Sequence, residues 1–176
     1  MGKKISIGIV SDTHGWVHPF LAEAFEGVEC ILHAGDIGRE EVIEELEEIA
    51  PVHAVKGNID GGDLRFYPEE VVKEIGGKRI GIRHICGSPK SPNKATRAFI
   101  KREKLDLLIV GHSHIPVVGR VLGTLWLNPG AAGKSGHHDL RFAARLHITD
   151  GEIEMDRIHL GERWKIPDES KGEENK

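Results

Sequence analysis

Seven side chains of types that bind metals follow strand-like runs of the sequence. The apolar run 107–110 is followed by Gly111 and then by two histidines. Three other strand-like runs also end in aspartate or histidine, and an asparagine lies in a further turn. Open α/β sheets bind their ligands at the carboxyl ends of their strands, so we expect these side chains to lie close together. They are Asp12, His14, Asp36, Asn58, His84, His112 and His114.

The chemistry of these side chains favours a transition-metal centre. All of them offer nitrogen or oxygen and none is a cysteine, which suits Mn, Fe, Ni or Zn better than Ca or Mg. Seven ligands exceed what one open catalytic ion takes, but they suit two ions that share a bridging carboxylate. Two metals about 3.5–4 Å apart clamp the attacking and leaving oxygens of a displacement at phosphorus. They also lower the pKa of a bridging water, so that hydroxide is available near neutral pH.

Each residue taken alone also has a simpler interpretation. Asp36 can cap a helix or form a turn, His14 can be a hydrogen-bonded loop histidine, and Asn58 can be a turn residue. Their joint occurrence, each behind a strand-like run and most beside a glycine, favours a site. Glycine at such places lets the loop turn sharply and lets a phosphate approach the backbone.

The hydrophobic pattern predicts the elements that position these residues. In the first half, strands over 4–11, 29–34 and 51–56 alternate with helices over 19–26 and 40–50, which implies a parallel sheet with right-handed crossovers. In the second half, Gly76-Gly77 indicates a hairpin between strands 69–75 and 78–83, and a helix over 91–104 precedes the strand 105–110. Antiparallel strands are expected over 116–122, 124–127, 142–149 and 152–159. Two sheets packed face to face, with helices outside both, would form one α/β sandwich.

Composition bounds the class of protein. The chain has 176 residues, 39% of them hydrophobic and 30% charged, which predicts a soluble globular protein with a single domain over residues 1–167. The segment 168–176 is charged, lacks apolar residues and is predicted to be disordered. A net charge of -4 gives no global basic surface for duplex nucleic acid, so no stable nucleic-acid binding is expected.

No membrane association is expected either, because no apolar stretch approaches the roughly 20 residues of a membrane helix. The two cysteines, Cys30 and Cys86, favour a reducing compartment, and the predicted location is the cytoplasm.

The ordered motifs resemble a known family. Asp12-x-His14, Gly35-Asp36, Gly57-Asn58, His84 and Gly111-His112-x-His114 resemble, in that order, the calcineurin-like metallophosphoesterases. The loop Asn128-Pro129-Gly130 is similar to the one that follows the histidine pair in the small prokaryotic phosphodiesterase branch, whose fold the retromer small subunit shares. The resemblance spans residues 5–133.

This resemblance implies a four-layer α-β-β-α sandwich of two mixed sheets with a binuclear site. One ion would be held by Asp12, His14, Asp36 and His114. The other would be held by Asp36, Asn58, His84 and His112, so that Asp36 bridges the two. Asp36, Asn58 and His84 are the residues to which we assign catalysis.

The expected function is a divalent-metal-dependent phosphoesterase, favouring diesters, that acts on a small phosphate ester. Its cofactors would be two divalent ions, with Mn²⁺ or Ni²⁺ favoured and Zn²⁺ or Fe²⁺ as alternatives, and a homo-oligomer is open. The alternative function is a protein-interaction scaffold with the same fold and little or no activity. A scaffold is free to lose metal ligands, and here all seven remain, which favours the enzyme.

The sequence departs from the family pattern at three places. Ile59 stands where many relatives have an acid-catalyst histidine after the asparagine. His84-Ile85-Cys86 replaces His-Gly-His, and Ala131-Ala132-Gly133 replaces a commoner serine. The first two bear on catalytic power. Other side chains stay open: His137 and His138 could reach substrate phosphate, and Cys86 could be a soft ligand, although packing beside the site is favoured. His33 is expected to be a hydrogen-bonded core histidine.

Overall fold

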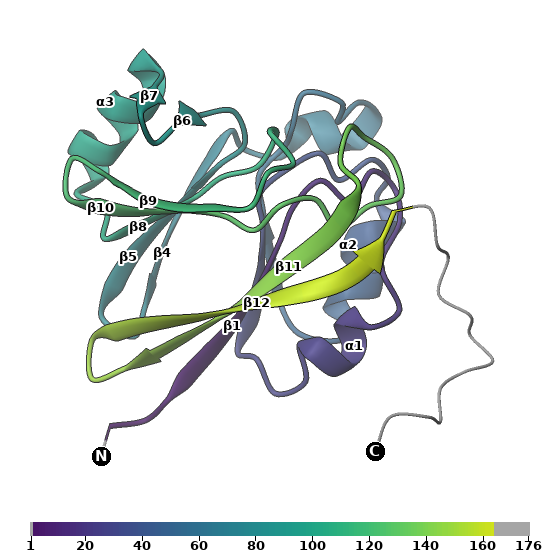
Figure 1. Ribbon diagram of the computed structural model, residues 1–176, viewed down its shortest axis with the longest axis horizontal. Helices are drawn as coiled ribbons and strands as arrows, with labels where there is room; N and C mark the ends of the chain where they lie inside the picture. Colours follow the sequence, from purple (N-terminus) through teal and green to yellow (C-terminus); the bar gives the residue numbers. More distant parts are fainter. Residues whose placement is uncertain (1, 164–176) are drawn as a thin grey trace.

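The computed structural model describes residues 2–163 and contains two five-stranded sheets (Figure 1). In the first sheet β1 (Ile5–Val10), β2 (Cys30–His33) and β3 (Val52–Ala54) run parallel. The long strands β11 (Leu140–Thr149) and β12 (Glu152–Glu162) join the β1 edge in antiparallel pairing, which gives the order β12-β11-β1-β2-β3. The first sheet is therefore mixed, as predicted.

The second sheet has the order β4-β5-β8-β10-β9. Its three central strands, β5 (Lys78–Arg83), β8 (Leu107–Ile109) and β10 (Thr124–Asn128), are parallel. The outer strands β4 (Glu70–Ile75) and β9 (Val117–Val121) pair antiparallel with their neighbours. This sheet is also mixed.

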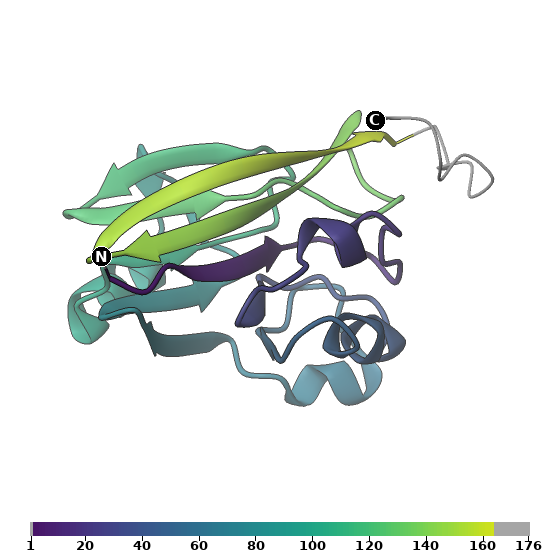
Figure 2. The same ribbon diagram turned by 90° about the horizontal axis from the view of Figure 1, so that it is seen from below.

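Three hydrophobic cores separate four layers. One core lies between the first sheet and the helices α1 (Leu21–Ala24) and α2 (Glu41–Glu47). A second core lies between the sheets, and a third lies between the second sheet and α3 (Lys94–Glu103). In both views α1 and α2 lie at the opposite end of the molecule from α3 (Figures 1 and 2). The α-β-β-α sandwich is confirmed.

Strand β8 illustrates how the sequence produces these layers. Leu107, Leu108 and Ile109 are all fully buried, which confirms the expectation of a strand buried on both faces. Leu107 and Ile109 belong to the core between the sheets, whereas Leu108 packs in the core that includes Phe99 of α3. Alternation along one strand thus supplies two cores.

All three expected helices are shorter in the structure, and the one expected over 40–50 is regular only over α2. The helix predicted from Ser91 begins at Lys94, because Asn93 caps it by accepting a hydrogen bond from the Thr96 N–H at 2.8 Å. The residues before the cap, β7 (Ser91–Pro92), pair instead with β6 (Gly87–Ser88) in a small hairpin. The helix expected over 19–26 is regular only over α1, and a 3-10 helix, η1 (Gly62–Phe66), was not foreseen.

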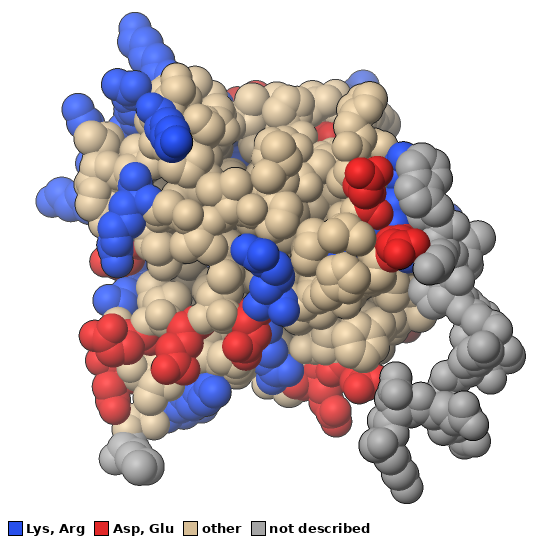
Figure 3. All heavy atoms as spheres, in the orientation of Figure 1, with Lys and Arg blue, Asp and Glu red and all other residues tan. Residues whose placement is uncertain are grey.

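The surface carries local charge that the net charge does not reveal. Lys and Arg side chains gather over the region of α3, at the upper left of Figure 3. Lys94, Arg97 and Lys101 of that helix are exposed. Within the described residues, no helix is long and apolar enough to cross a membrane. The segment 168–176, predicted to be disordered, lies outside the described residues.

Candidate metal centre

All seven predicted residues follow the carboxyl ends of parallel strands. Asp12 and His14 follow β1, Asp36 follows β2, and Asn58 follows β3 in the first sheet. His84 follows β5, and the histidine pair follows β8 in the second sheet. The two sheets direct these ends to one place, and the structure brings the seven side chains together in two adjoining groups, consisting of Asp12, His14, Asp36 and His114, and of Asp36, Asn58, His84 and His112.

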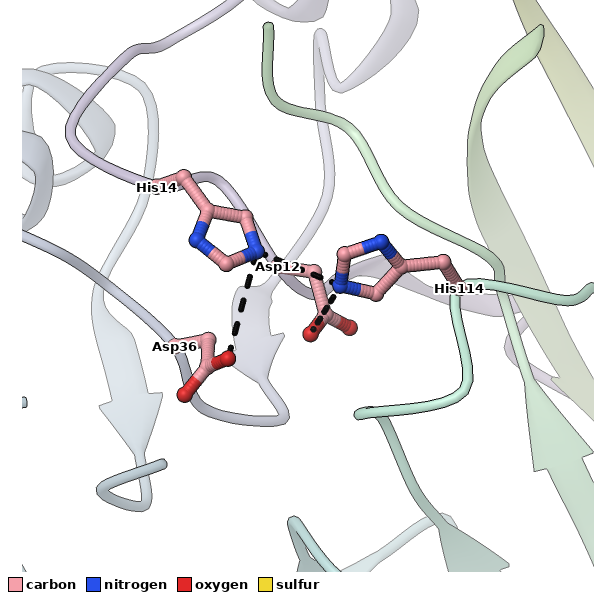
Figure 4. A group of neighbouring side chains, drawn as sticks. All are labelled: Asp12, His14, Asp36 and His114. Atoms are coloured by element: carbon pink, nitrogen blue, oxygen red, sulfur yellow. Dashed lines mark hydrogen bonds and ion pairs between the residues drawn. The ribbon is translucent and has the colours of Figure 1, made fainter. Parts of the chain in front are cut away.

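In the first group, Asp12, His14, Asp36 and His114 offer four ligand atoms that all lie within 4.8 Å of one another (Figure 4). The His114 Nε2 atom lies 3.2 Å from Asp12 Oδ1 and 3.2 Å from His14 Nε2. The His14 Nε2 atom lies 3.9 Å from Asp36 Oδ2. Both carboxylates are buried, with Asp12 at 0% and Asp36 at 3% exposure.

In the second group, Asn58 Oδ1 lies at the centre. It is 3.1 Å from His84 Nε2 and 2.9 Å from His112 Nδ1. The His84 Nε2 atom is also 3.2 Å from Asp36 Oδ1. Asp36 therefore presents one carboxylate oxygen to each group, as a bridging ligand would.

The backbone at the site is left-handed at most of the candidate ligands. Five of the eight non-glycine residues with positive φ in the described part of the chain are candidate ligands, namely Asp12, His14, Asp36, His112 and His114. Such conformations are uncommon for residues with a Cβ atom and cluster at functional sites. Glycine would adopt them at lower cost, but it has no side chain to bind a metal.

Hydrogen bonds with surrounding backbone and side-chain groups orient the candidate metal ligands. The His84 Nδ1–H donates to the Ala34 carbonyl at 2.7 Å, because a carbonyl can only accept, and this leaves the His84 Nε2 lone pair for the site. Asp12 accepts the Ser11 hydroxyl at 2.6 Å and the His112 N–H at 3.1 Å. Asp36 Oδ1 accepts the Ile59 N–H at 3.1 Å.

Electrostatics keep the central carboxylate ionised. Burial by itself would raise the pKa of Asp36, but the hydrogen bond and charge of His84, the Ile59 N–H and His14 outweigh it, and the pKa lies below its usual value. Burial lowers the pKa of His14, which favours its neutral form. An ionised carboxylate beside several imidazole nitrogens fits divalent transition-metal ions.

Asp60 supports the site and was not predicted. It is buried, and its Oδ2 accepts the Gly57 N–H at 2.7 Å and the Ile37 N–H at 3.1 Å, while Oδ1 accepts the Gly38 N–H at 2.9 Å. One carboxylate thus ties the loop of Asp36 to the loop of Asn58. The only signal was its place in Asn58-Ile59-Asp60. Gly57 permits this approach, because a Cβ atom there would collide with Asp36.

Asn128 supports the histidine pair from the second sheet. It is buried, and its amide donates to the Gly111 carbonyl at 3.0 Å and to the Ser113 hydroxyl at 3.0 Å. Its Oδ1 accepts the Gly130 N–H at 2.9 Å. The Asn128-Pro129-Gly130 loop therefore braces the segment that carries His112 and His114.

Five other side chains differ in their burial and contacts. His33 is fully buried and hydrogen-bonded, as expected. Cys86 is 2% exposed, belongs to the core beneath α3, and has a pKa that burial raises to about 12. The expectation that Cys86 is a packed side chain is therefore confirmed. His138 is buried with its Nδ1 3.0 Å from His114 Nδ1, and its reach toward substrate phosphate stays a prediction. His137 and Ile59 are exposed.

A cleft adjoins the second group. It has a volume of about 280 Å³ and is lined by Lys56, Gly57, Asn58, Glu69, Arg83, His84 and Ile85. Arg83 forms an ion pair with Glu70, and Lys56 forms one at 3.8 Å with Glu69, which also lines the cleft. The cleft therefore brings a cation and an apolar side chain to one side of the centre.

Comparison with known proteins identifies the family. A probable metallophosphoesterase of Methanocaldococcus jannaschii is 34% identical over 137 residues, covering 74% of this chain and 70% of that protein. A phosphodiesterase of the same organism is 31% identical over 139 residues, covering 72% of this chain and 83% of that protein. The crystal structure of Vps29 from Entamoeba histolytica with Zn²⁺ has a TM-score of 0.68 at 23% identity, over 89% of this chain and 100% of that chain, which shows the same fold.

The family model agrees with these relatives. The calcineurin-like phosphoesterase superfamily domain matches residues 5–151, a range that contains all seven candidate ligands and most of both sheets. The chain therefore belongs to the calcineurin-like phosphoesterase superfamily, a family of metallophosphoesterases.

Proposed function

We propose that this protein is a divalent-metal-dependent phosphodiesterase with a centre for two ions. The observation that supports this most is the placement of Asp36. Its two oxygens face separate groups of donors, Oδ2 toward His14 and Oδ1 toward His84. One buried carboxylate between two sets of nitrogen and oxygen donors is what a pair of adjacent ions requires. The proposed ions are Mn²⁺ or Ni²⁺, with Zn²⁺ or Fe²⁺ as alternatives that the same donor set also suits.

The candidate ligands have different proposed roles in catalysis. Two ions bound there would supply a nucleophile from water near neutral pH and would stabilise charge on the phosphate oxygens. Asp36 is oriented by the Ile59 N–H, and His84 by the Ala34 carbonyl, so neither needs to reorganise when substrate enters. Asn58 contributes a neutral oxygen, which limits the negative charge that a phosphodiester meets.

The cleft beside Asn58 and His84 is the proposed place for one ester group of the substrate. Lys56 would offset the charge of the phosphodiester, and Ile85 offers an apolar wall that is 41% exposed. A volume of about 280 Å³ is sufficient for a small organic substituent. The substrate is therefore proposed to be a small phosphodiester.

A scaffold function is the second candidate, and the structural likeness to Vps29 is the observation that favours it. The convergence of all seven donors supports the enzyme instead, because a scaffold has no need for left-handed ligand residues.

Metal dependence is the direct test. We expect chelated protein to lose hydrolysis of bis(4-nitrophenyl) phosphate, and we expect Mn²⁺ or Ni²⁺ to restore it better than Ca²⁺, which prefers oxygen ligands. Elemental analysis should find two ions per chain. Undiminished turnover by protein shown to be metal-free would overturn the two-ion proposal, and two bound ions without turnover would favour the scaffold.

Asp36→Asn tests the bridging role. The substitution keeps the shape of the side chain but removes the negative charge shared by both groups, so metal content should fall below two ions per chain. The loss of activity should exceed that of Asn58→Ala, which removes one neutral ligand. If Asp36→Asn retains two ions and near-normal turnover, the proposed ligand assignment is incorrect.

A further inference from the structure

A chain of hydrogen bonds runs from the metal centre into the loop between β10 and β11. The Nδ1 atoms of His114 and His138 lie 3.0 Å apart, and their rings meet edge to face with centroids 5.0 Å apart. On its other side, His138 Nε2 lies 3.0 Å from the Gly133 carbonyl oxygen. His138 is buried, with 7% exposure.

The acceptor at the end of this chain fixes the proton positions. A carbonyl can only accept, so His138 Nε2 carries a hydrogen, and in the neutral ring Nδ1 is then an acceptor. The hydrogen between the two rings must therefore lie on His114 Nδ1. This leaves His114 Nε2 for the side that faces Asp12 Oδ1 and His14 Nε2, each 3.2 Å away.

The loop that supplies this arrangement is anchored on the opposite side of the centre. The Gly133 N–H donates to the Asp12 carbonyl at 3.0 Å, and the Ala132 N–H donates to the Ser11 carbonyl at 3.0 Å. Contacts therefore run in a closed circuit from Asp12 through Gly133, His138 and His114 back to Asp12. Gly136 leaves room for it, because its φ is +130° and a Cβ atom there would collide with both imidazole rings.

We propose that His138 is a positioning residue that holds His114 in the tautomer and orientation required to bind a metal ion through Nε2. The inference rests on the proposed metal centre. His84 receives the same orientation from the Ala34 backbone carbonyl, which no side-chain substitution removes. For His114 the orienting group is a side chain, so its role can be tested while all seven ligands stay in place. Outer partners of this kind are typically worth about 10- to 100-fold in metal affinity.

The test compares three variants of the full chain. His138→Ala removes the acceptor, and His138→Gln replaces it with an amide that can accept from His114 and donate to Gly133. His137→Ala is the matched control, because His137 is the neighbouring histidine in the same loop and is exposed. Mn²⁺ affinity and stoichiometry are measured for each by competition with a chelator, and thermal unfolding of the metal-free proteins checks that each is folded.

We expect His138→Ala to weaken one of the two ions by about 10- to 100-fold, while the other ion and the His137→Ala variant keep the affinity of the unmodified protein. His138→Gln should recover most of the loss. In Zn²⁺-loaded protein labelled with ¹⁵N-histidine, long-range ¹H–¹⁵N spectra should show His114 protonated at Nδ1, and His138→Ala should broaden or shift that signal.

Two results would overturn the inference, namely two ions bound by folded His138→Ala with unchanged affinity, or a His114 ring bound through Nδ1. Failure of the unmodified protein to bind two ions would instead count against the proposed function, so the two failures are distinguishable.

Discussion

At the scale of single residues, the centre consists of side chains on a backbone that disfavours them. Left-handed φ values at five candidate ligands cost on the order of 1 kcal/mol or more each. Neighbouring loops hold them in place: the Asp12 N–H donates to the Gly35 carbonyl at 3.0 Å, and the His14 N–H donates to the Asp36 carbonyl at 3.0 Å. The ligand loops therefore stabilise one another, and a bound ion has little left to organise.

Ile59 gives a prediction about the leaving group. It is 47% exposed beside the centre, and its aliphatic side chain cannot donate the proton that a departing oxygen needs. A positioned general acid is typically worth about 10²–10⁴-fold. Nitrophenolate is a stable anion and leaves without that proton, whereas alkoxides do not. Across a series of aryl and alkyl phosphodiesters, log rate should fall steeply as the leaving-group pKa rises.

Ile59→His should flatten this slope if the new imidazole reaches the leaving oxygen, and Ile59→Leu is the matched control that should leave it unchanged. A nearly flat slope in the unmodified protein, with chemistry shown to be rate-limiting, would mean that another group already donates the proton.

At the scale of elements, buried polar side chains join the loops that follow neighbouring strands. His33 at the end of β2 accepts the Gly35 N–H through Nδ1 at 3.1 Å. Its Nε2 lies 2.9 Å from Thr13 Oγ1, and that hydroxyl donates to the Ile37 carbonyl at 3.0 Å, so Nε2 is the donor to Thr13. A neutral His33 thus forms hydrogen bonds both to Thr13 in the loop after β1 and to Gly35 in the loop after β2.

This arrangement predicts how stability depends on pH. Burial lowers the pKa of His33 to about 4, below the 6.5 of an unfolded chain. As the pH falls below about 6.5, the unfolded state takes up the proton first, so stability is lost between about pH 6.5 and about pH 4, by up to about 3 kcal/mol. Above about pH 6.5, His33 is neutral in both the folded and the unfolded state, so it no longer contributes to the pH dependence of the unfolding free energy.

Denaturant unfolding of chelated protein at several pH values measures the effect. His33→Gln should be less stable at pH 7, because hydrogen bonds are lost, but its stability should fall less between pH 6.5 and 4. His137→Gln, an exposed control, should keep the original slope. An identical slope in His33→Gln would show that other groups carry the pH dependence.

The sequence predicted the strand ends well and their supports poorly. Apolar runs such as β8 and the polar residues behind them are local patterns, and they were sufficient to place the seven candidate ligands. Asp60 binds backbone groups 22 and 23 residues away, and His138 meets a ring 24 residues away. No local pattern specifies such partners, since they depend on how loops from different strands pack. The β6–β7 hairpin was missed because two-residue strands carry no periodicity.

At the scale of the whole molecule, the centre joins the two sheets. The first sheet contributes both carboxylates, one histidine and the asparagine, whereas the second sheet contributes His84, His112 and His114. Away from the centre, the sheets meet through apolar side chains, including Ile7, Leu32, Ile80 and Ile109. Hydrophobic burial holds the two sheets together but is non-directional. Donor atoms from both sheets that bind the same ions would therefore fix the position of one sheet relative to the other.

A bound ion should strengthen that link between the two sheets. An ion that binds only the native state stabilises it by about 2.7 kcal/mol at a free concentration 100 times its dissociation constant. Mn²⁺ should therefore raise the unfolding temperature of chelated protein. Hydrogen exchange should slow together at the carboxyl ends of β1 and β2 in the first sheet and of β5 and β8 in the second. Asn58→Ala and His84→Ala, which remove one ligand from each sheet, should both reduce the effect. Protection confined to one sheet in the unmodified protein would contradict a centre shared between them.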